Sequence, residues 1–199
     1  MVLDVKSEDE IKSLTYTIQN IVVKISLNLG EDLALRKINA KINNSEYNPE
    51  RFPGLFIRFK YPKCVSIIFR NGKLIITGLK LFNQIDLVIK LLILKLNENV
   101  KISIEESLIV QEIVNIVGTA NFYKQINLDL AVTVLENAIY EPEVFPGLVY
   151  NSFNPVKSVF LIFSTGKIVF TGIRKEIIIE PALINLGRLL DRKKLFMTS

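Results

Sequence analysis

The sequence contains no histidine and only one cysteine, Cys64. The absence of histidine excludes Ser-His and Cys-His catalysis and most zinc sites. Cys64 has no second cysteine for an internal disulfide and no histidine that would activate its thiolate. A P-loop and a glycine-rich dinucleotide-binding motif are also absent. We therefore expect a protein that is not an enzyme and that binds no cofactor or metal.

Long hydrophobic runs are absent too, although 49% of the 199 residues are hydrophobic. No run reaches the roughly 18 uncharged apolar residues that a membrane-spanning helix needs. The most apolar stretch, residues 87–96, is interrupted by Lys90 and Lys95. The first residues, Met1 to Asp4, lack the basic and then apolar order of a signal peptide. Together with the single cysteine, these features predict an intracellular chain with a sizeable hydrophobic core.

Carboxylates are missing from two long stretches of this chain, whose formal net charge is +5. Residues 51–80 and 144–175 hold none of the 20 Asp and Glu residues. The basic residues in these stretches are Arg51, Arg58, Lys60, Lys63, Arg70, Lys73 and Lys80, then Lys157, Lys167, Arg174 and Lys175. A surface that lies on phosphates excludes carboxylates, because each one would repel the polyanion. The pattern favours nucleic-acid binding; the alternative is that buried strands carry few acidic residues in any case.

The chain repeats one set of motifs after 93 to 95 residues. The repeated motifs are Asn20-Ile21-Val22 and Asn115-Ile116-Val117, Tyr47-Asn48-Pro49-Glu50 and Tyr140-Glu141-Pro142-Glu143, Phe52-Pro53-Gly54-Leu55 and Phe145-Pro146-Gly147-Leu148, Ile67-Ile68-Phe69 and Leu161-Ile162-Phe163, Gly72-Lys73 and Gly166-Lys167, and Thr77-Gly78 and Thr171-Gly172. Two copies of one unit are most simply packed around a pseudo-two-fold axis. Duplex DNA has the same local symmetry, which again favours a nucleic-acid partner.

Each half follows the order strand, helix, strands, helix. Hydrophobic periodicity predicts first strands at residues 16–29 and 112–123 and first helices at 32–42 and 129–137. Capping candidates for these helices are Glu31 or Asp32 and Asn127 or Asp129. Asn71-Gly72 and Thr165-Gly166 are expected hairpin turns. Closing helices are expected at 81–96 and at 181–195, where Pro181 suits a first turn. The fold class is therefore α+β, with helices on one face of an antiparallel sheet.

No linker rich in Gly or Ser separates the halves. We expect an N-terminal extension at residues 1–15 and two repeats, 16–100 and 101–199, that join in one intimate structural unit. The strands carry more apolar residues than one layer of helices needs to cover. An open apolar sheet face is typical of a binding surface, unless both faces are covered.

At these motifs the chain resembles the TATA-box-binding protein family in its archaeal form, over roughly residues 16–195. The doubled set of motifs is specific, whereas a single Phe-Pro-Gly would not be. The resemblance implies a pseudo-two-fold saddle of two repeats. It implies a ten-stranded curved antiparallel sheet with four helices on the convex face and DNA on the concave face. Minor-groove wedging and sharp kinking are already known for this family, so no bend angle is inferred for this chain.

The resemblance also implies roles for individual residues. Phe52 with Phe69, and Phe145 with Phe163, are similar to the two pairs that wedge into base steps. Asn20 and Asn115 resemble the central donors to minor-groove acceptors, and Thr77 and Thr171 resemble the hydroxyl donors beside them. The implied apolar contacts are Val22, Ile67, Ile75, Val117, Leu161 and Val169. The implied phosphate contacts are Arg51, Arg58, Lys63, Lys73 and Lys167. For each of these residues the alternative is an ordinary core, strand or solvated position.

The turn around Pro142 resembles the family's docking site for transcription factor B. Glu141, Glu143 and Val144 are the implied contacts, and RNA polymerase would follow indirectly. The implied partners are thus double-stranded promoter DNA and transcription factor B, in a chain that is cytoplasmic and nucleoid-associated if archaeal, or nuclear if eukaryotic. The resemblance leaves open whether the chain forms a weak homodimer when it is free of DNA.

The chain departs from the family pattern at several positions. Asn151 stands where the family usually has arginine, and Val156 is one extra residue between Phe145 and Phe163. Leu87 to Leu94 are apolar around most of the helix, where the family exposes basic residues, and this pattern predicts a helix buried on several sides. An alternative function is therefore a diverged saddle-fold paralogue, which would act as a regulatory DNA-binding or protein-interaction module with an altered partner or site preference.

Overall fold

The computed structural model describes residues 15–29, 31–100, 102, 104 and 106–197. Ten antiparallel strands have the hydrogen-bonded order β2-β3-β4-β5-β1-β6-β10-β9-β8-β7. The predicted α+β class, the repeat and the ten-stranded sheet are confirmed. The predicted N-terminal extension, residues 1–15, lies outside the described residues except for Thr15. No helix in the described part of the chain is long and apolar enough to cross a membrane.

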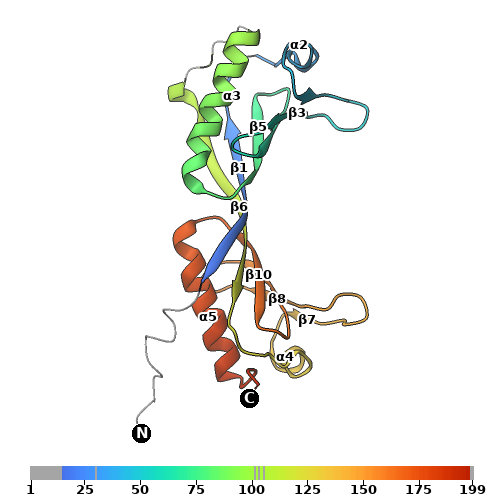
Figure 1. Cartoon of the computed structure of the whole chain (residues 1–199), viewed down its shortest axis with the longest axis vertical. Helices are drawn as coiled ribbons and strands as arrows, with labels where there is room; N and C mark the ends of the chain where they lie inside the picture. The colour runs from blue at the N-terminus through green and yellow to red at the C-terminus, as the bar shows by residue number, and fades with distance from the viewer. Residues whose placement is uncertain (1–14, 30, 101, 103, 105, 198–199) are drawn as a thin grey trace. The chain divides into compact units, whose positions relative to one another are not determined.

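Residues Gln19–Asn115 form one compact unit. The strands of this half are β1 (Tyr16–Ser26), β2 (Ser45–Glu46), β3 (Leu55–Phe59), β4 (Cys64–Ile68) and β5 (Lys73–Leu79). Its α-helices are α2 (Leu35–Lys41) and α3 (Ile85–Val100), and a short 3-10 turn, Phe82–Gln84, precedes α3. Helix α3 lies along one side of the strands of this half (Figure 1).

Residues 116–197, with the described residues up to Ile18, form the second compact unit. The strands of this half are β6 (Val110–Asn121), β7 (Ala138–Ile139), β8 (Leu148–Ser152), β9 (Ser158–Ile162) and β10 (Lys167–Ile173). Its α-helices are α4 (Leu128–Val134) and α5 (Ile179–Arg192). Two further 3-10 turns, Glu106–Leu108 and Glu176–Ile178, precede β6 and α5.

The strands bury alternate residues, as a sheet covered on one face requires. In β4, for example, Cys64, Ser66 and Ile68 are buried, whereas Val65 and Ile67 are half-buried. Helix α3 packs its buried residues Val88, Leu92 and Leu96 into the core of its own half. The half-buried residues belong to the other face, which we call the open face. The expectation of one open sheet face is therefore met in each half.

The helix boundaries differ from the expected ones by a few residues. Helix α2 begins at Leu35 without a side-chain cap, and the capping candidate Asp32 instead forms an ion pair with Arg70 at 3.0 Å. Helix α4 does use its expected cap, since Asn127 Oδ1 accepts the Leu130 N–H at 2.9 Å. Pro181 lies in the first turn of α5, as expected. The extra residue near Val156 lies in the loop between β8 and β9, which is longer than the loop between β3 and β4.

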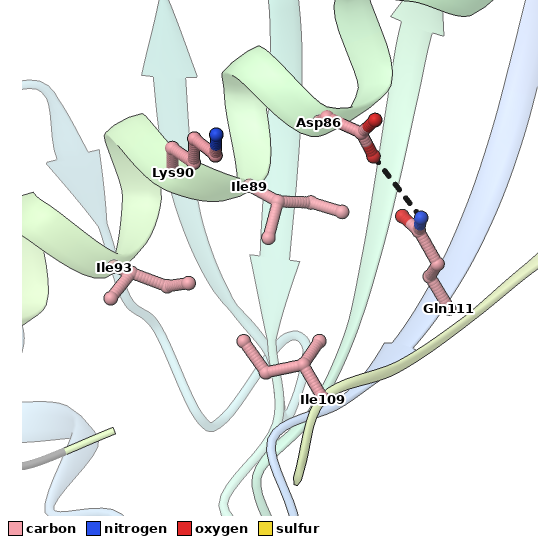
Figure 2. Close-up of a pocket in the computed structure, with 6 residues that line it drawn as sticks. All are labelled: Asp86, Ile89, Lys90, Ile93, Ile109 and Gln111. Atoms are coloured by element: carbon pink, nitrogen blue, oxygen red, sulfur yellow. Dashed lines mark hydrogen bonds between the residues drawn. The ribbon is translucent and has the colours of Figure 1, made fainter. Parts of the chain in front are cut away.

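The prediction that residues 87–94 are buried on several sides is wrong for two leucines. Leu87 and Leu94 are 45% and 53% exposed, because α3 has a single buried face. A small cavity of about 220 Å³ lies beside this helix. Figure 2 shows Ile89 and Ile93 of the helix on the side of Ile109. At its edge, Asp86 accepts a hydrogen bond from Gln111 at 3.1 Å, so this carboxylate already has a partner.

Candidate nucleic-acid interface

The open face of the first half is built from rows of side chains that run across neighbouring strands. Ile67 pairs with Ile75 and Phe56, and Val65 pairs with Thr77 and Arg58. All but Arg58 of these side chains are half-buried. Val22 of β1 is also half-buried and lies at an irregularity in the pairing between Ile21 and Val23. Val22, Ile67, Ile75 and Thr77 therefore share one face, which sequence alternation alone could not establish.

The second half repeats these rows with different residues. Leu161 pairs with Val169 and Val149, and Val159 pairs with Thr171 and Asn151. Val117 and Asn115 are half-buried residues of β6. The result is a second apolar surface of the same design, flanked by a threonine at the same place. The matching of the two halves extends from the sequence motifs to the registers of their strands.

Asn20 is held by β5 through its side-chain oxygen. The backbone N–H of Gly78 donates to Asn20 Oδ1 at 2.7 Å. A backbone N–H is only a donor, so the atom facing it is the oxygen, and Nδ2 is directed to Thr77 Oγ1 at 3.2 Å. The amide group has two hydrogens, and Thr77 uses one of them. The second hydrogen of Nδ2 can donate to an acceptor that approaches the open face.

The four phenylalanines form two matched pairs. The ring centroids of Phe52 and Phe69 lie 6.0 Å apart, and those of Phe145 and Phe163 lie 5.9 Å apart. Phe52 is 39% exposed and the other three are half-buried, so none belongs to the closed core. Each pair therefore offers ring surface that a ligand can cover.

The glycine of each Phe-Pro-Gly-Leu motif makes room for its phenylalanine. A Cβ at Gly54 would lie 2.6 Å from Phe52 Cε1, and one at Gly147 would lie 2.8 Å from Phe145 Cε1. Real Cβ atoms do not approach other carbons so closely. The motif thus fixes the position of an exposed ring on the backbone next to it, which explains why these residue types occur together.

The predicted phosphate contacts are exposed, and one of them already has an ion-pair partner. Arg51, Lys63, Lys73 and Lys167 are exposed residues in or beside turns. Arg58 lies within β3 and pairs with Glu46 Oε2 at 3.3 Å, where both side chains are largely solvated. Asn151 takes the place of Arg58 in the second half, and its backbone N–H bonds to the Asn137 carbonyl. The second half therefore lacks a cation at this position.

The acidic turn between β7 and β8 is compact and exposed. The N–H groups of Val144 and Phe145 both donate to the Glu141 carbonyl at 2.9 Å. Glu141 and Glu143 are exposed, and Val144 is 80% exposed. The first half forms the same turn, with Arg51 and Phe52 donating to the Asn48 carbonyl. The two turns share a backbone form but differ in charge.

Sequence reasoning missed several residues of the open face. Val65 and Val159, Phe56 and Val149, and Lys24 and Thr119 lie in the same rows as the predicted residues. Period-two alternation from Ile67 and Leu161 would have found the two valines. The pairing of Lys24 with Ile75 could not be found that way, because it depends on the register between β1 and β5.

Cys64 is not part of this surface. Its side chain is buried, and burial raises the pKa of the thiol to about 11. A thiol with so high a pKa is almost entirely protonated near neutral pH, so it is a weak nucleophile.

Comparisons with known proteins agree with the repeated architecture. Residues 15–99 and 111–193 each match the family model described as Transcription factor TFIID (or TATA-binding protein, TBP). The TATA-box-binding protein of Pyrobaculum islandicum is 42% identical over 166 residues, which cover 81% of this chain and 79% of the relative. That of Thermoplasma volcanium is 42% identical over 179 residues, which cover 88% and 94%.

A solved structure shares the fold. The Methanococcus jannaschii TBP superimposes with a TM-score of 0.77 at 38% sequence identity. The match covers 90% of this chain and 98% of the solved one. The similarity thus extends over both halves.

Proposed function

Because this chain belongs to the TATA-box-binding protein family, we propose that it is a general transcription initiation factor that binds A·T-rich, TATA-like promoter DNA in the minor groove. The observation that carries the proposal is the open face. In each half it combines apolar rows with a threonine and a partly exposed phenylalanine pair. No catalytic group is needed for this activity.

The apolar rows would select A·T over G·C pairs. In the minor groove a G·C pair presents the guanine 2-amino donor, whereas A·T pairs present only acceptors. Ile67 and Ile75 offer that amino group no acceptor, so a G·C pair would lose the hydrogen bond it makes with water. Asn20 Nδ2 would donate to adenine N3 or thymine O2, with its oxygen held by Gly78.

The phenylalanine pairs would kink the duplex. Each pair presents ring surface next to a glycine-supported backbone, and inserted apolar rings partly unstack a base step. Arg51, Arg58, Lys63, Lys73 and Lys167 would contact phosphates and make affinity depend on salt. Arg58 would have to give up its ion pair with Glu46, which costs little because both groups are solvated.

The acidic turn would recruit transcription factor B, and RNA polymerase through it. Glu141 and Glu143 would steer a basic partner, and exposed Val144 would supply the apolar contact. Glu141→Arg with Glu143→Arg should leave DNA binding intact and abolish the ternary complex in a gel-shift assay. Glu98→Arg with Glu180→Arg is a control for the same change of charge on exposed helix positions away from the turn and from the open face. Survival of the ternary complex would exclude this turn as the docking site.

The alternative is a diverged paralogue, a regulatory DNA-binding or protein-interaction module with an altered partner or site preference. Exposed Leu87 and Leu94 on α3 and the uncharged Asn151 favour it. Titration of an A·T-rich duplex and a G·C-rich control separates the two functions. Equal affinity for both duplexes would favour the alternative.

The wedges have their own test on the preferred duplex. Phe69→Ala and Phe163→Ala should each weaken binding and reduce bending measured by fluorescence transfer between the duplex ends. Leu94→Ala is the matched control, because Leu94 is exposed but belongs to the helix on the other face. Unchanged bending in both phenylalanine variants would rule out the wedge assignment.

A further inference from the structure

The second half contains a polar hollow on the helix-covered side of its sheet. A cavity of about 550 Å³ has Tyr150, Ser152, Asn185, Arg188, Asp191 and Arg192 in its lining. Tyr150 and Ser152 alternate along β8 with Val149 and Asn151, which lie in the rows of the open face. The hollow therefore opens away from the face proposed to bind DNA.

Comparison with the first half shows how the hollow arises. Tyr150 and Ser152 replace Ile57 and Phe59, which are buried in the core of the first half. Asn185 and Arg188 on α5 replace Leu91 and Leu94 on α3. Four apolar positions, two on the sheet and two on the helix, have thus become polar together. Ile57 and Phe59 are buried in the first half, whereas Leu91 and Leu94 lie half-buried or exposed on their helix. The sheet positions therefore exchange core side chains for the polar wall of the hollow, and the helix positions add polar groups at its rim.

Positive charge is concentrated at this hollow. Arg188 and Arg192 are one helical turn apart on α5, so they lie on the same face of the helix. Neither arginine has an ion pair within the described part of the chain. Lys193 and Lys194 follow directly and are exposed. Asp191 is the carboxylate in the lining, and Glu136 lies close enough to Tyr150 to help raise the pKa of its hydroxyl. Two carboxylates therefore face the two arginines and the two lysines.

The neutral groups of the hollow also act mainly as donors. Burial raises the pKa of the Tyr150 hydroxyl, which therefore stays protonated and can donate. The Asn185 amide can donate through its nitrogen. Ser152 Oγ donates to the Asn154 carbonyl at 3.1 Å and also hydrogen-bonds with the Tyr150 hydroxyl, which it holds against the wall of the hollow. Two guanidinium groups, a phenol and an amide together suit an oxyanion.

We propose that this hollow binds an acidic segment of a partner protein, with its carboxylates on Arg188 and Arg192. Side chains at i and i+4 of a helix are about 6 Å apart. Alternate residues of an extended peptide are about 6.6 Å apart, so a Glu-x-Glu segment can reach both arginines. A carboxylate pairs with arginine in a bidentate manner. Asp191 repels either ligand, but it repels the two charges of a compact phosphate dianion more strongly than a single carboxylate. The proposal does not depend on DNA binding by the open face.

Calorimetric titration with a short synthetic peptide of alternating Glu and Ser tests the proposal. The wild-type chain should bind this peptide and not the matching peptide of alternating Gln and Ser. Arg188→Gln with Arg192→Gln should weaken binding by about tenfold or more, because two charged hydrogen-bonding partners are lost. Lys37→Gln with Lys41→Gln removes the same charge from exposed i and i+4 positions of α2 and should leave the affinity for the peptide unchanged. Tyr150→Phe should weaken binding, and Asp191→Asn should strengthen it.

Two outcomes would overturn the proposal. Equal weakening by the arginine and the lysine double variants would mean that the peptide responds only to net charge. Binding of inorganic tripolyphosphate, lost in the arginine variant, with no binding of the Glu peptide would identify a phosphate site instead. Thermal melts of each variant show whether the fold is retained, and both arginines are exposed, so no large change in melting temperature is expected.

Discussion

Phe170 fills the space left by the missing side chain of Gly118, its partner across β10 and β6. A Cβ at Gly118 would lie 2.2 Å from Phe170 Cζ. In the first half the corresponding pair is Val23 and Ile76, which also face each other across two strands. The first half thus fills this place in the core with two side chains of medium size. The second half fills it with one large ring opposite a residue that has no side chain.

This relationship predicts a rescue. Gly118→Ala should destabilise the protein by about 1–3 kcal/mol, the usual cost of overpacking a core. Gly118→Val combined with Phe170→Ile copies the first half and should recover most of that loss. Urea denaturation of the variants measures both effects. If the double variant is less stable than Gly118→Val alone and Phe170→Ile alone, the two halves do not share this packing solution.

A second prediction concerns Ser66, which is fully buried in β4. Its Oγ has no hydrogen-bond partner within the described residues. Ser66→Ala should therefore be neutral or stabilise the protein by about 1 kcal/mol, because a buried unsatisfied hydroxyl is removed. Ser158→Ala is the control, since Ser158 Oγ donates to the Val156 carbonyl at 3.2 Å and its loss should destabilise. A similar loss of stability in both variants would contradict the first expectation. Chemical denaturation measures both.

The third prediction follows from the way Asn20 is held. Asn20→Ala should weaken DNA binding by about 1–3 kcal/mol, the scale of a good base-edge contact. The variant should lose its discrimination between base pairs at the middle of the DNA site. Thr77→Val keeps the shape of its side chain and loses the hydroxyl, so it should cost less. An even loss over all duplex sequences would instead mark Asn20 as a structural residue that supports the Gly78 backbone.

The fourth prediction concerns the thiol of Cys64. Its folded pKa of about 11 is two units above the ordinary value of 9.0, so alkylation by iodoacetamide at pH 8 should be about a hundredfold slower in the folded than in the unfolded chain. Between about pH 9 and pH 11, the Cys64 thiol keeps its proton in the folded state and loses it in the unfolded state. Stability should therefore fall as pH rises from about 9 to 11. Rapid alkylation without denaturant would show that the thiol is accessible.

The doubled motifs made most of the fold predictable. Phe-Pro-Gly-Leu and Thr-Gly mark local backbone features that need those residue types, such as the close approach of Phe52 to Gly54 and the positive φ of Gly78. Boundaries were less predictable, because tertiary contacts compete for the same side chains. Asp32 could have capped α2, but its ion pair with Arg70 engages it elsewhere, and the helix begins at Leu35.

The hollow under α5 was not predictable from the sequence. Asn185 and Arg188 read as ordinary solvated helix positions until β8 is known to lie beneath them with Tyr150 and Ser152. The exposure of Leu87 and Leu94 was missed for a related reason. A helix that is apolar around most of its circumference indicates burial only if neighbouring elements exist to cover each side, and hydrophobic periodicity does not count those neighbours.

The shortness of β2 and β7 has a consequence for aggregation of this chain at high concentration. These two-residue strands are the outermost members of the sheet. An edge strand aggregates by adding a strand from another molecule, and a ladder of two residues gives such an addition almost no hydrogen bonds to gain. Glu46 in β2 also carries a charge into that position. A protein with an apolar open face thereby denies other copies the backbone template on which fibrous assembly would begin.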